Sequence, residues 1–300
     1  MSIIKDAKIS FRSGNTVMQL IIINVVVFLS VLAVRLGLLI SFGQEGYHKP
    51  FNEFVGWFAM PYDWYQLVIH PYTIITHFFL HADPFHLLFN MLAMYWFGII
   101  LSDLGGPRRV LPAYVFGALT GAAFSFASYY LLPNLWPGKV DYMLGASAGV
   151  MAILLAAATL APDYKLYLVF FGAVSIKYIA LVYVVLDLFF LSGGNTGGHL
   201  AHIGGALFGW FYIFQLRRGF DISAGFNRAV DRVKNFFDNK PRPKVRVTYR
   251  RPNNANPDFN ALSSVERQRR IDEILDKISK SGYDGLTKEE KEILFKASKD

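Results

Sequence analysis

Six long apolar blocks constrain this chain more than any other feature of its sequence. They lie at about 17–40, 86–102, 110–132, 144–161, 177–192 and 199–216. A helix of roughly 20 apolar residues crosses the hydrocarbon core of a bilayer, and the shorter blocks can span it with tilt or with the support of neighbouring helices. The sequence therefore predicts an all-α fold, a polytopic membrane bundle of six transmembrane helices with a short soluble C-terminal tail.

Composition agrees with a membrane protein. Hydrophobic residues make up 53% of the chain and charged residues only 17%, and the mean hydropathy is +0.32. A soluble domain carries more charge than this. The chain has no cysteine, which excludes disulfides, thiolate metal ligands and a cysteine nucleophile. No cleavable signal peptide is evident, because the apolar run from Val17 has no small-residue cleavage site after it.

The net charge of +8 reflects membrane topology and predicts no nucleic-acid partner. Basic residues precede the first block, follow the second, border the turn after the fourth and follow the sixth. They are Lys5, Lys8, Arg12, Arg108, Arg109, Lys165, Lys177, Arg217 and Arg218. With the N-terminus in the cytosol, all of them fall on the cytosolic side, as the positive-inside rule requires. We therefore expect both termini to be cytosolic.

The same pattern divides the chain into three parts. They are a cytosolic N-terminus at 1–16, a six-helix core at 17–218, and a basic linker with a small helical tail at 219–300. Residues 239–258 are rich in Pro, Asn and Arg, as linkers are. Two short amphipathic helices are predicted after it, at Ser263 to Lys280 and Thr287 to Lys299. The tail is either a docking unit for a cytosolic partner or a solvated extension.

Polar residues gather at the beginning of three alternate blocks. The second block carries His86 and Asn90 on one helix face, the fourth begins around Ser147, and the sixth begins around His202. Because these three blocks run in the same direction, their first residues lie at the same, outer membrane face. Ser147 and His202 are then each about 5 Å below the boundary, at ~1.5 Å per residue. Polar groups inside a membrane are candidates for function by default.

These residue types can perform acyl transfer. Ser147 would attack a carbonyl after giving its proton to His202, while the oxyanion would be stabilised by His86, Asn90 and the Ser147 backbone N–H. Glycines favour close packing around them, at Gly145 and Gly149 on the fourth block and Gly205 and Gly209 on the sixth. The sequence places no carboxylate to orient His202. For Asp187, in the fifth block, the expected role is a structural hydrogen bond, so a Ser147–His202 dyad is predicted.

Three motifs in this order resemble those of the rhomboid intramembrane proteases. They are His-Leu-Leu-Phe-Asn at 86–90, Gly-x-Ser-x-Gly at 145–149, and Ala-His-x-x-Gly-x-x-x-Gly at 201–209. The resemblance covers about residues 15–218. It implies Ser147 as the nucleophile, His202 as the base, His86 and Asn90 as the oxyanion-stabilising pair, and the loop at 193–198 as a mobile cap. Ala148 and Met151 depart from the family pattern, and neither change removes a catalytic group.

The resemblance also implies the partners. We expect single-pass transmembrane proteins as substrates, the lipid bilayer as surroundings, and no cofactor or metal. Because no Arg-rich, acid-poor transit peptide is evident, we expect a bacterial inner membrane, with the site toward its outer side.

The sequence leaves three other functions to consider against the protease. A catalytically inactive, client-binding relative usually lacks the serine or the histidine, and both are present. A metal site could gather His77, His81, His86, His199 and His202. No acidic ligand accompanies this histidine set, as one would in zinc proteases. A transporter would carry polar residues through the full depth of the bilayer, whereas these concentrate near one face.

Overall fold

A computed structural model describes residues 15–81, 83–136, 138, 140–237 and 263–298. The chain divides into two compact units, residues 1–239 and 240–300. The first basic cluster (Lys5, Lys8 and Arg12) and the predicted linker at 239–258 lie outside the described residues.

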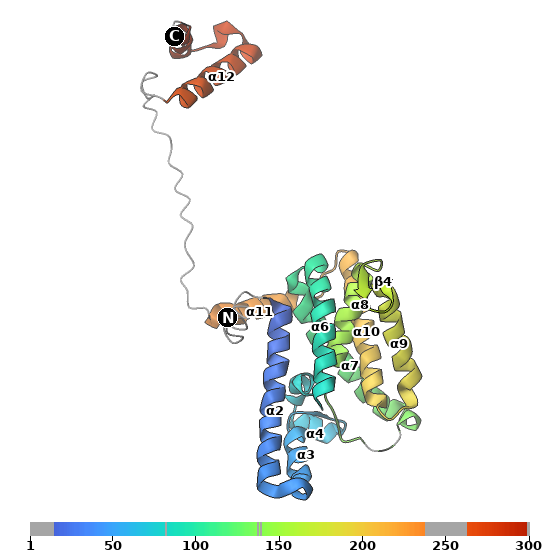
Figure 1. The fold of residues 1–300 in the computed structure, drawn as a ribbon. Coiled ribbons are helices and arrows are strands. Elements are labelled where there is room, and N and C mark those ends of the chain that lie inside the picture. Colours follow the sequence, from blue (N-terminus) through green and yellow to red (C-terminus); the bar gives the residue numbers. More distant parts are fainter. Residues whose placement is uncertain (1–14, 82, 137, 139, 238–262, 299–300) are drawn as a thin grey trace. The chain divides into compact units, whose positions relative to one another are not determined.

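Long helices form at all six predicted blocks (Figure 1). They are α2 (Thr16–Gly46), α6 (Pro84–Gly105), α7 (Val110–Leu131), α8 (Ser147–Leu160), α9 (Ile176–Phe189) and α10 (Thr196–Arg217). Within the described residues, three helical stretches are long and apolar enough to cross a membrane, namely α2, α6 and α7 with its preceding turn, while α8 is a shorter apolar helix. The all-α fold is confirmed, and the count of six spans stays a prediction.

The helices α6, α8 and α10 begin at the same end of the bundle, and α2, α7 and α9 run the opposite way (Figure 1). Side chains cap two of the three starts at this end. Asp83 accepts a hydrogen bond from the His86 N–H at 2.9 Å, and Asn195 accepts one from the Gly198 N–H at 3.3 Å. The start of α8 has no side-chain cap. The first backbone N–H groups of α8 are therefore free of a capping side chain and can donate hydrogen bonds to another group.

Short elements fill the segment between α2 and α6. They are α3 (His48–Gly56), β1 (Met60–Pro61), α4 (Trp64–Ile69), α5 (Thr73–Thr76) and the 3-10 turn η1 (His77–Phe79). Strand β1 pairs antiparallel with β2 (Tyr142–Met143), with Met60 opposite Met143. The Gly145 N–H then donates to the His77 carbonyl at 3.0 Å. The segment that leads into α8 is therefore held by the first loop.

Backbone contact joins α10 to α7 and α8. A Cβ atom on Gly205 would collide with the backbone of Ala148, and one on Gly209 would collide with the backbone of Ala152. A Cβ on Gly121 of α7 would lie 2.5 Å from the Ala201 carbonyl oxygen. Lipid tails are as apolar as the side chains, so the hydrophobic effect does not drive helices together in a membrane. They associate instead through close packing of small residues such as these. The three helices thus form the rigid centre of the bundle.

The opposite end of the bundle carries a β-hairpin and a further helix. The hairpin pairs β3 (Lys165–Leu168) with β4 (Gly172–Ser175), between α8 and α9. Helix α11 (Ala224–Phe237) follows α10, although the sequence predicted no helix there. The Phe226 ring lies 5.1 Å from the Phe116 ring of α7, centroid to centroid. Short 3-10 turns occur at Pro107–Arg109 (η2), Pro133–Leu135 (η3) and Phe190–Ser192 (η4).

The C-terminal unit contains α12 (Ser264–Ser281), the turn η6 (Tyr283–Gly285) and α13 (Lys288–Ala297). Helices are thus present at both predicted positions. Both begin with a capping box, Ser263 with Glu266 and Thr287 with Glu290. The Lys277 ammonium lies 2.8 Å from the Glu290 carboxylate and joins the two helices.

Gly209→Ala is expected to lower the thermal stability of the bundle. The added methyl group must displace the backbone of α8, and overpacking of this kind costs about 1–3 kcal/mol. Thermal unfolding of the purified protein in detergent measures the effect as a lower Tm. The matched control is Gly37→Ala in α2, where nothing lies within 4 Å of the new Cβ. An unchanged Tm for both variants would contradict the backbone contact between α8 and α10.

Candidate active site

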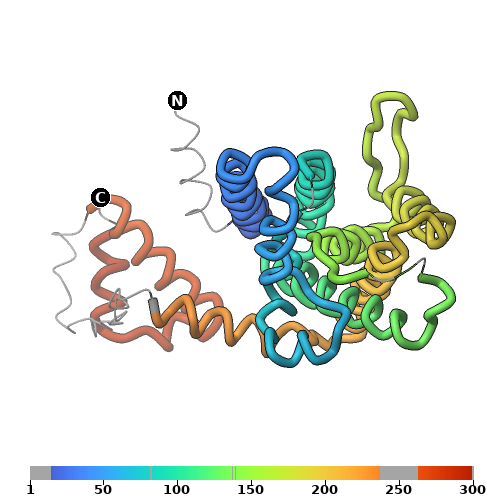
Figure 2. Tube along the Cα trace, turned by 90° about the horizontal axis from the view of Figure 1, so that it is seen from below, coloured from blue at the N-terminus to red at the C-terminus, as the bar shows by residue number. Residues whose placement is uncertain are grey.

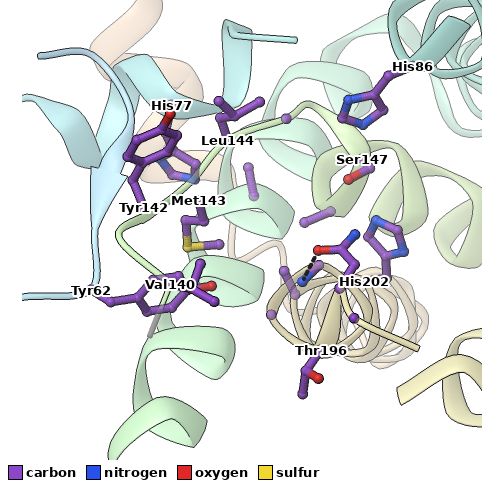
Figure 3. Close-up of a pocket in the computed structure, with 18 of the residues that line it drawn as sticks. Tyr62, His77, His86, Val140, Tyr142, Met143, Leu144, Ser147, Thr196 and His202 are labelled. Carbon is purple, nitrogen blue, oxygen red and sulfur yellow. Dashed lines mark hydrogen bonds between the residues drawn. The ribbon is translucent and has the colours of Figure 1, made fainter. Parts of the chain in front are cut away.

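A cavity of about 590 Å³ lies at the end of the bundle where α6, α8 and α10 begin. Of the predicted catalytic and oxyanion-stabilising residues, His86, Ser147 and His202 line it, and the predicted packing residue Gly145 lines it as well. Figure 3 shows the Ser147 side chain between the rings of His86 and His202. Three different helices therefore bring these residues to one hollow.

Ser147 is the first residue of α8, and the residues before it leave the helix end open. Gly145 has φ +131°, a backbone conformation that residues other than glycine rarely adopt. Neither Gly145 nor Ala146 has a side-chain oxygen that could accept the first N–H groups of the helix. Those N–H groups have no partner inside the helix and form the positive end of its dipole. The serine hydroxyl thus lies beside backbone donors that no side chain caps.

His86 approaches the serine from α6. A Cβ on Gly145 would lie 3.4 Å from Nε2 of His86 and 3.6 Å from Oγ of Ser147, so the ring and the hydroxyl flank one point. Asn90 is placed differently. Its amide Nδ2 donates to the His86 carbonyl at 2.8 Å, and Asn90 is absent from the cavity lining. The structure brings His86, but not the Asn90 amide, to the serine.

A buried carboxylate holds His202, contrary to the sequence-based expectation. Asp187 of α9 accepts a hydrogen bond at Oδ1 from Nδ1 of His202 at 2.8 Å. The expectation that no carboxylate orients His202 is therefore wrong. With its proton held on Nδ1, the imidazole presents an unprotonated Nε2, the form that a general base requires. Within the described residues, the Ser147 hydroxyl makes no hydrogen bond with this ring, and a free site commonly holds nucleophile and base apart until substrate binds.

The error arose because the sequence alone did not match the depth of Asp187 to that of His202. The fifth block was predicted to end at about residue 192. Helix α9 ends at Phe189, so Asp187 lies two residues from the helix end and level with the first turns of α10. An unexplained acidic residue inside an apolar block was the signal that could have found it.

His199 shares the same carboxylate oxygen. Its Nδ1 lies 2.8 Å from Oδ1 of Asp187. Among the described residues, Asp187, His199 and His202 are the group whose ligand atoms lie close enough to hold a metal ion, all within 4.8 Å of one another. The alternative histidine set with His77 and His81 does not form such a group among those residues. An ion on Nδ1 of His202 would displace the hydrogen bond that orients the ring, and the expectation of no metal stays a prediction.

The glycines predicted near the site lie between its helices. Gly205 and Gly209 face the backbone of α8, as described above. A Cβ on Gly149 would lie 2.6 Å from Cδ2 of Tyr114. Tyr114 is fully buried and donates from its hydroxyl to the Phe78 carbonyl at 2.7 Å. The glycines therefore set the distance of α8 from both α7 and α10.

Residues 194–198 form one wall of the cavity, and the predicted loop at 193–198 is shorter in the structure, because α10 already begins at Thr196. The position of this wall depends on Ser125, whose hydroxyl donates to the Gly197 carbonyl at 2.9 Å and lies 2.8 Å from the Tyr62 hydroxyl. A Cβ on Gly197 would collide with the Tyr62 hydroxyl and lie 2.7 Å from the Trp136 ring. Aromatic side chains from the first loop and from the α7–α8 connection thus enclose the space in front of Ser147.

Comparison with known proteins gives two family matches. Residues 69–219, which hold all the cavity-lining helices, match the model of the rhomboid domain. Residues 260–300 match a family of unknown function (DUF6576).

Individual relatives agree with the first match. The chain is 31% identical over 158 residues to "RHOMBOID-like protein 12, mitochondrial" of Arabidopsis thaliana, which covers 49% of this chain and 47% of that protein. It is 33% identical over 138 residues to "Presenilin-associated rhomboid-like protein A, mitochondrial" of Danio rerio, covering 45% and 35%. For "Rhomboid-like protein 16, chloroplastic" of Arabidopsis thaliana, the identity is 32% over 106 residues, covering 32% and 33%. Each match spans less than half of the relative's length.

These relatives overturn the predicted location. The sequence predicted a bacterial inner membrane, whereas the relatives are named as mitochondrial or chloroplastic. The prediction is wrong, and the cytosolic termini and outward-facing site that were derived for that membrane are withdrawn with it. The physical reason is that site motifs carry the chemistry, while the membrane address is read from separate segments.

Low pH is expected to destabilise the fold through His77. This side chain is 2% exposed and donates a hydrogen bond from Nδ1 to the Thr73 carbonyl. Burial lowers the pKa of His77 from 6.5 to about 4. Between these values the unfolded chain binds more protons. The stability contributed by neutral His77 is therefore complete above pH 6.5 and falls as the pH drops toward 4, by about 2 kcal/mol at pH 5.

The measurement is Tm at pH 7.5 and pH 5 for the wild type and for His77→Asn, whose amide can donate to the same carbonyl. The wild type should lose more stability on acidification than the variant. Equal losses would contradict a buried, neutral His77.

Proposed function

Since this chain belongs to the rhomboid family, we propose that it is a serine endopeptidase that cuts transmembrane proteins within the membrane. The observation that carries the proposal is the hydrogen bond from Nδ1 of His202 to Asp187 at 2.8 Å beside a serine in the same cavity. A histidine held in this tautomer directs Nε2 at an incoming hydroxyl proton. Binding of a client without cleavage would not require it.

The reaction follows from the groups in the cavity. Nε2 of His202 takes the Ser147 hydroxyl proton as Oγ attacks the scissile carbonyl carbon. The imidazolium, stabilised by Asp187, then gives the proton to the leaving amine, and the peptide bond breaks to leave an acyl-serine. Water activated by the same Nε2 hydrolyses this ester and regenerates the serine.

The oxyanion would be stabilised from two sides. The uncapped N–H groups at the start of α8 lie beside Ser147. The His86 ring approaches the Ser147 hydroxyl from α6. One such donor is worth about 3–4 kcal/mol in the transition state. The expected contribution of Asn90 as a second side-chain donor stays a prediction, because its amide is engaged with the His86 carbonyl.

Single-pass membrane proteins are the proposed substrates. A transmembrane helix that enters from the lipid would have to unwind near small or helix-breaking residues, because its scissile carbonyl is otherwise engaged in an intrahelical bond. The cavity supports this step, since it is about 590 Å³ in volume and lies at one end of the bundle, where water can reach an acyl-enzyme.

Ser147→Ala and His202→Ala should each abolish cleavage of a labelled transmembrane substrate in liposomes. Loss of either group removes the nucleophile or its base, and the rate should fall by at least about 10³-fold. Matched controls are Ser30→Ala, at an exposed serine of α2, and His48→Ala, at an exposed histidine; both should keep wild-type rates. Cleavage that survives Ser147→Ala would refute the mechanism.

Asp187→Asn should lower kcat and leave KM within about twofold, because the change disturbs the tautomer of His202 and not substrate binding. A loss of at least about 10-fold in kcat is expected. Asp163→Asn, at an exposed aspartate, is the matched control. A rise in KM at constant kcat, or full activity of Asp187→Asn, would show that the carboxylate has only a structural role.

A further inference from the structure

The hairpin of β3 and β4 has a fixed base and an apolar tip. At its base, the Ile176 N–H donates to the Tyr164 carbonyl at 2.9 Å, and the side chain of Ile176 is fully buried. Leu166 packs against the main hydrophobic core. Leu168 pairs with Gly172 across the three-residue tip, where Gly172 has φ +68°. The base therefore fixes the direction in which the tip projects.

The tip exposes large apolar side chains. Val169 and Phe170 are each 91% exposed, and Phe171 is 79% exposed. Residues 166–176 contain no charged side chain. The described part of the chain supplies no third strand for this sheet, and an isolated two-stranded hairpin is at best marginally stable in water. Soluble surfaces rarely gather such an apolar group without a partner.

The base of the hairpin has the chemistry of a membrane interface. Tyr164 and Tyr178 flank it and are partly exposed. The Lys177 ammonium pairs with the Asp163 carboxylate at 2.5 Å, and Lys165 is exposed at the start of β3. Tyrosine rings and lysine side chains are favoured at the level of lipid headgroups. The hairpin thus combines polar groups at its base with apolar groups at its tip, the combination found in segments that bind at a membrane interface.

The position of the hairpin points to the occupant. It joins the end of α8 to the start of α9, at the end of the bundle opposite Ser147 (Figure 1). Seen along the helices, it projects sideways from the bundle, at the right of Figure 2. The neighbouring face of α9 is also apolar and exposed, including Leu181 at 57% and Val185 at 51%. The hairpin thus adjoins a helix that exposes apolar side chains of the kind that lipid covers.

We propose that residues 165–175 form a lipid-inserting finger, with Val169, Phe170 and Phe171 in the acyl region of the same bilayer that holds the helices. The base then lies among the headgroups. The finger enlarges the membrane-bound surface at the end of the bundle remote from the cavity. This proposal is independent of the proteolytic activity, because it requires only that the helices are membrane-embedded.

A single thiol label tests the finger, because the chain contains no cysteine. Phe170→Cys is labelled with an environment-sensitive fluorophore such as NBD and reconstituted into phosphatidylcholine vesicles with or without doxyl-labelled lipid. We expect emission shifted to shorter wavelength, quenching by the doxyl lipid, and protection from aqueous iodide. Asp163→Cys, at the base, should be more accessible to iodide and less quenched by the lipid.

Leu181→Cys on α9 provides the lipid-exposed reference, and the Phe170 label should resemble it. A Phe170 label that iodide quenches and doxyl lipid does not would overturn the proposal, provided that Leu181→Cys reports lipid in the same vesicles. If the Phe170 label is shielded from both quenchers, the tip is buried in protein and the lipid assignment is wrong. Catalytic activity does not enter either outcome.

Discussion

The backbone contact between α8 and α10 is the constraint on which the site depends. Ser147 begins one of these helices and His202 lies in the second turn of the other, so their separation is set by how closely the two helices approach. Gly205 and Gly209 leave no room for a Cβ against α8. In lipid, burial of apolar surface contributes little to helix association. The close packing of α8 and α10 therefore holds Ser147 and His202, two polar residues that the membrane disfavours, in place.

Asp187 extends this arrangement to a third helix. A carboxylate at membrane depth is costly unless it is paired or hydrogen-bonded, and the imidazoles of His199 and His202 both lie 2.8 Å from its Oδ1. The pairing therefore serves α9 and the site together: it offsets the cost of the buried acid and fixes the orientation of the His202 ring. A substitution of Asp187 affects both the chemistry of His202 and the packing of α9. Measuring kcat and KM separately distinguishes the two effects.

The sequence predicted correctly those features that depend only on the direction of the helices and on the position of the motifs within them. All six long helices occur at the predicted blocks, and the shared direction of α6, α8 and α10 gathers His86, Ser147 and His202 at one cavity. It was least informative where the outcome depended on a helix end or on a three-dimensional contact. The hydrogen bond between Asp187 and His202 was not predicted, and the Asn90 amide donates to a carbonyl of its own helix. Motifs that define chemistry also carried no membrane address.

The most direct test of a nucleophilic Ser147 is covalent labelling of the intact protein in its membrane by a fluorophosphonate, followed by mass-spectrometric mapping of the adduct. This reagent reacts with activated serines and requires no known substrate. We expect a single adduct on Ser147 that disappears in His202→Ala, because the hydroxyl then lacks its base. An unlabelled Ser147 in folded wild-type protein, or labelling that does not depend on His202, would contradict it.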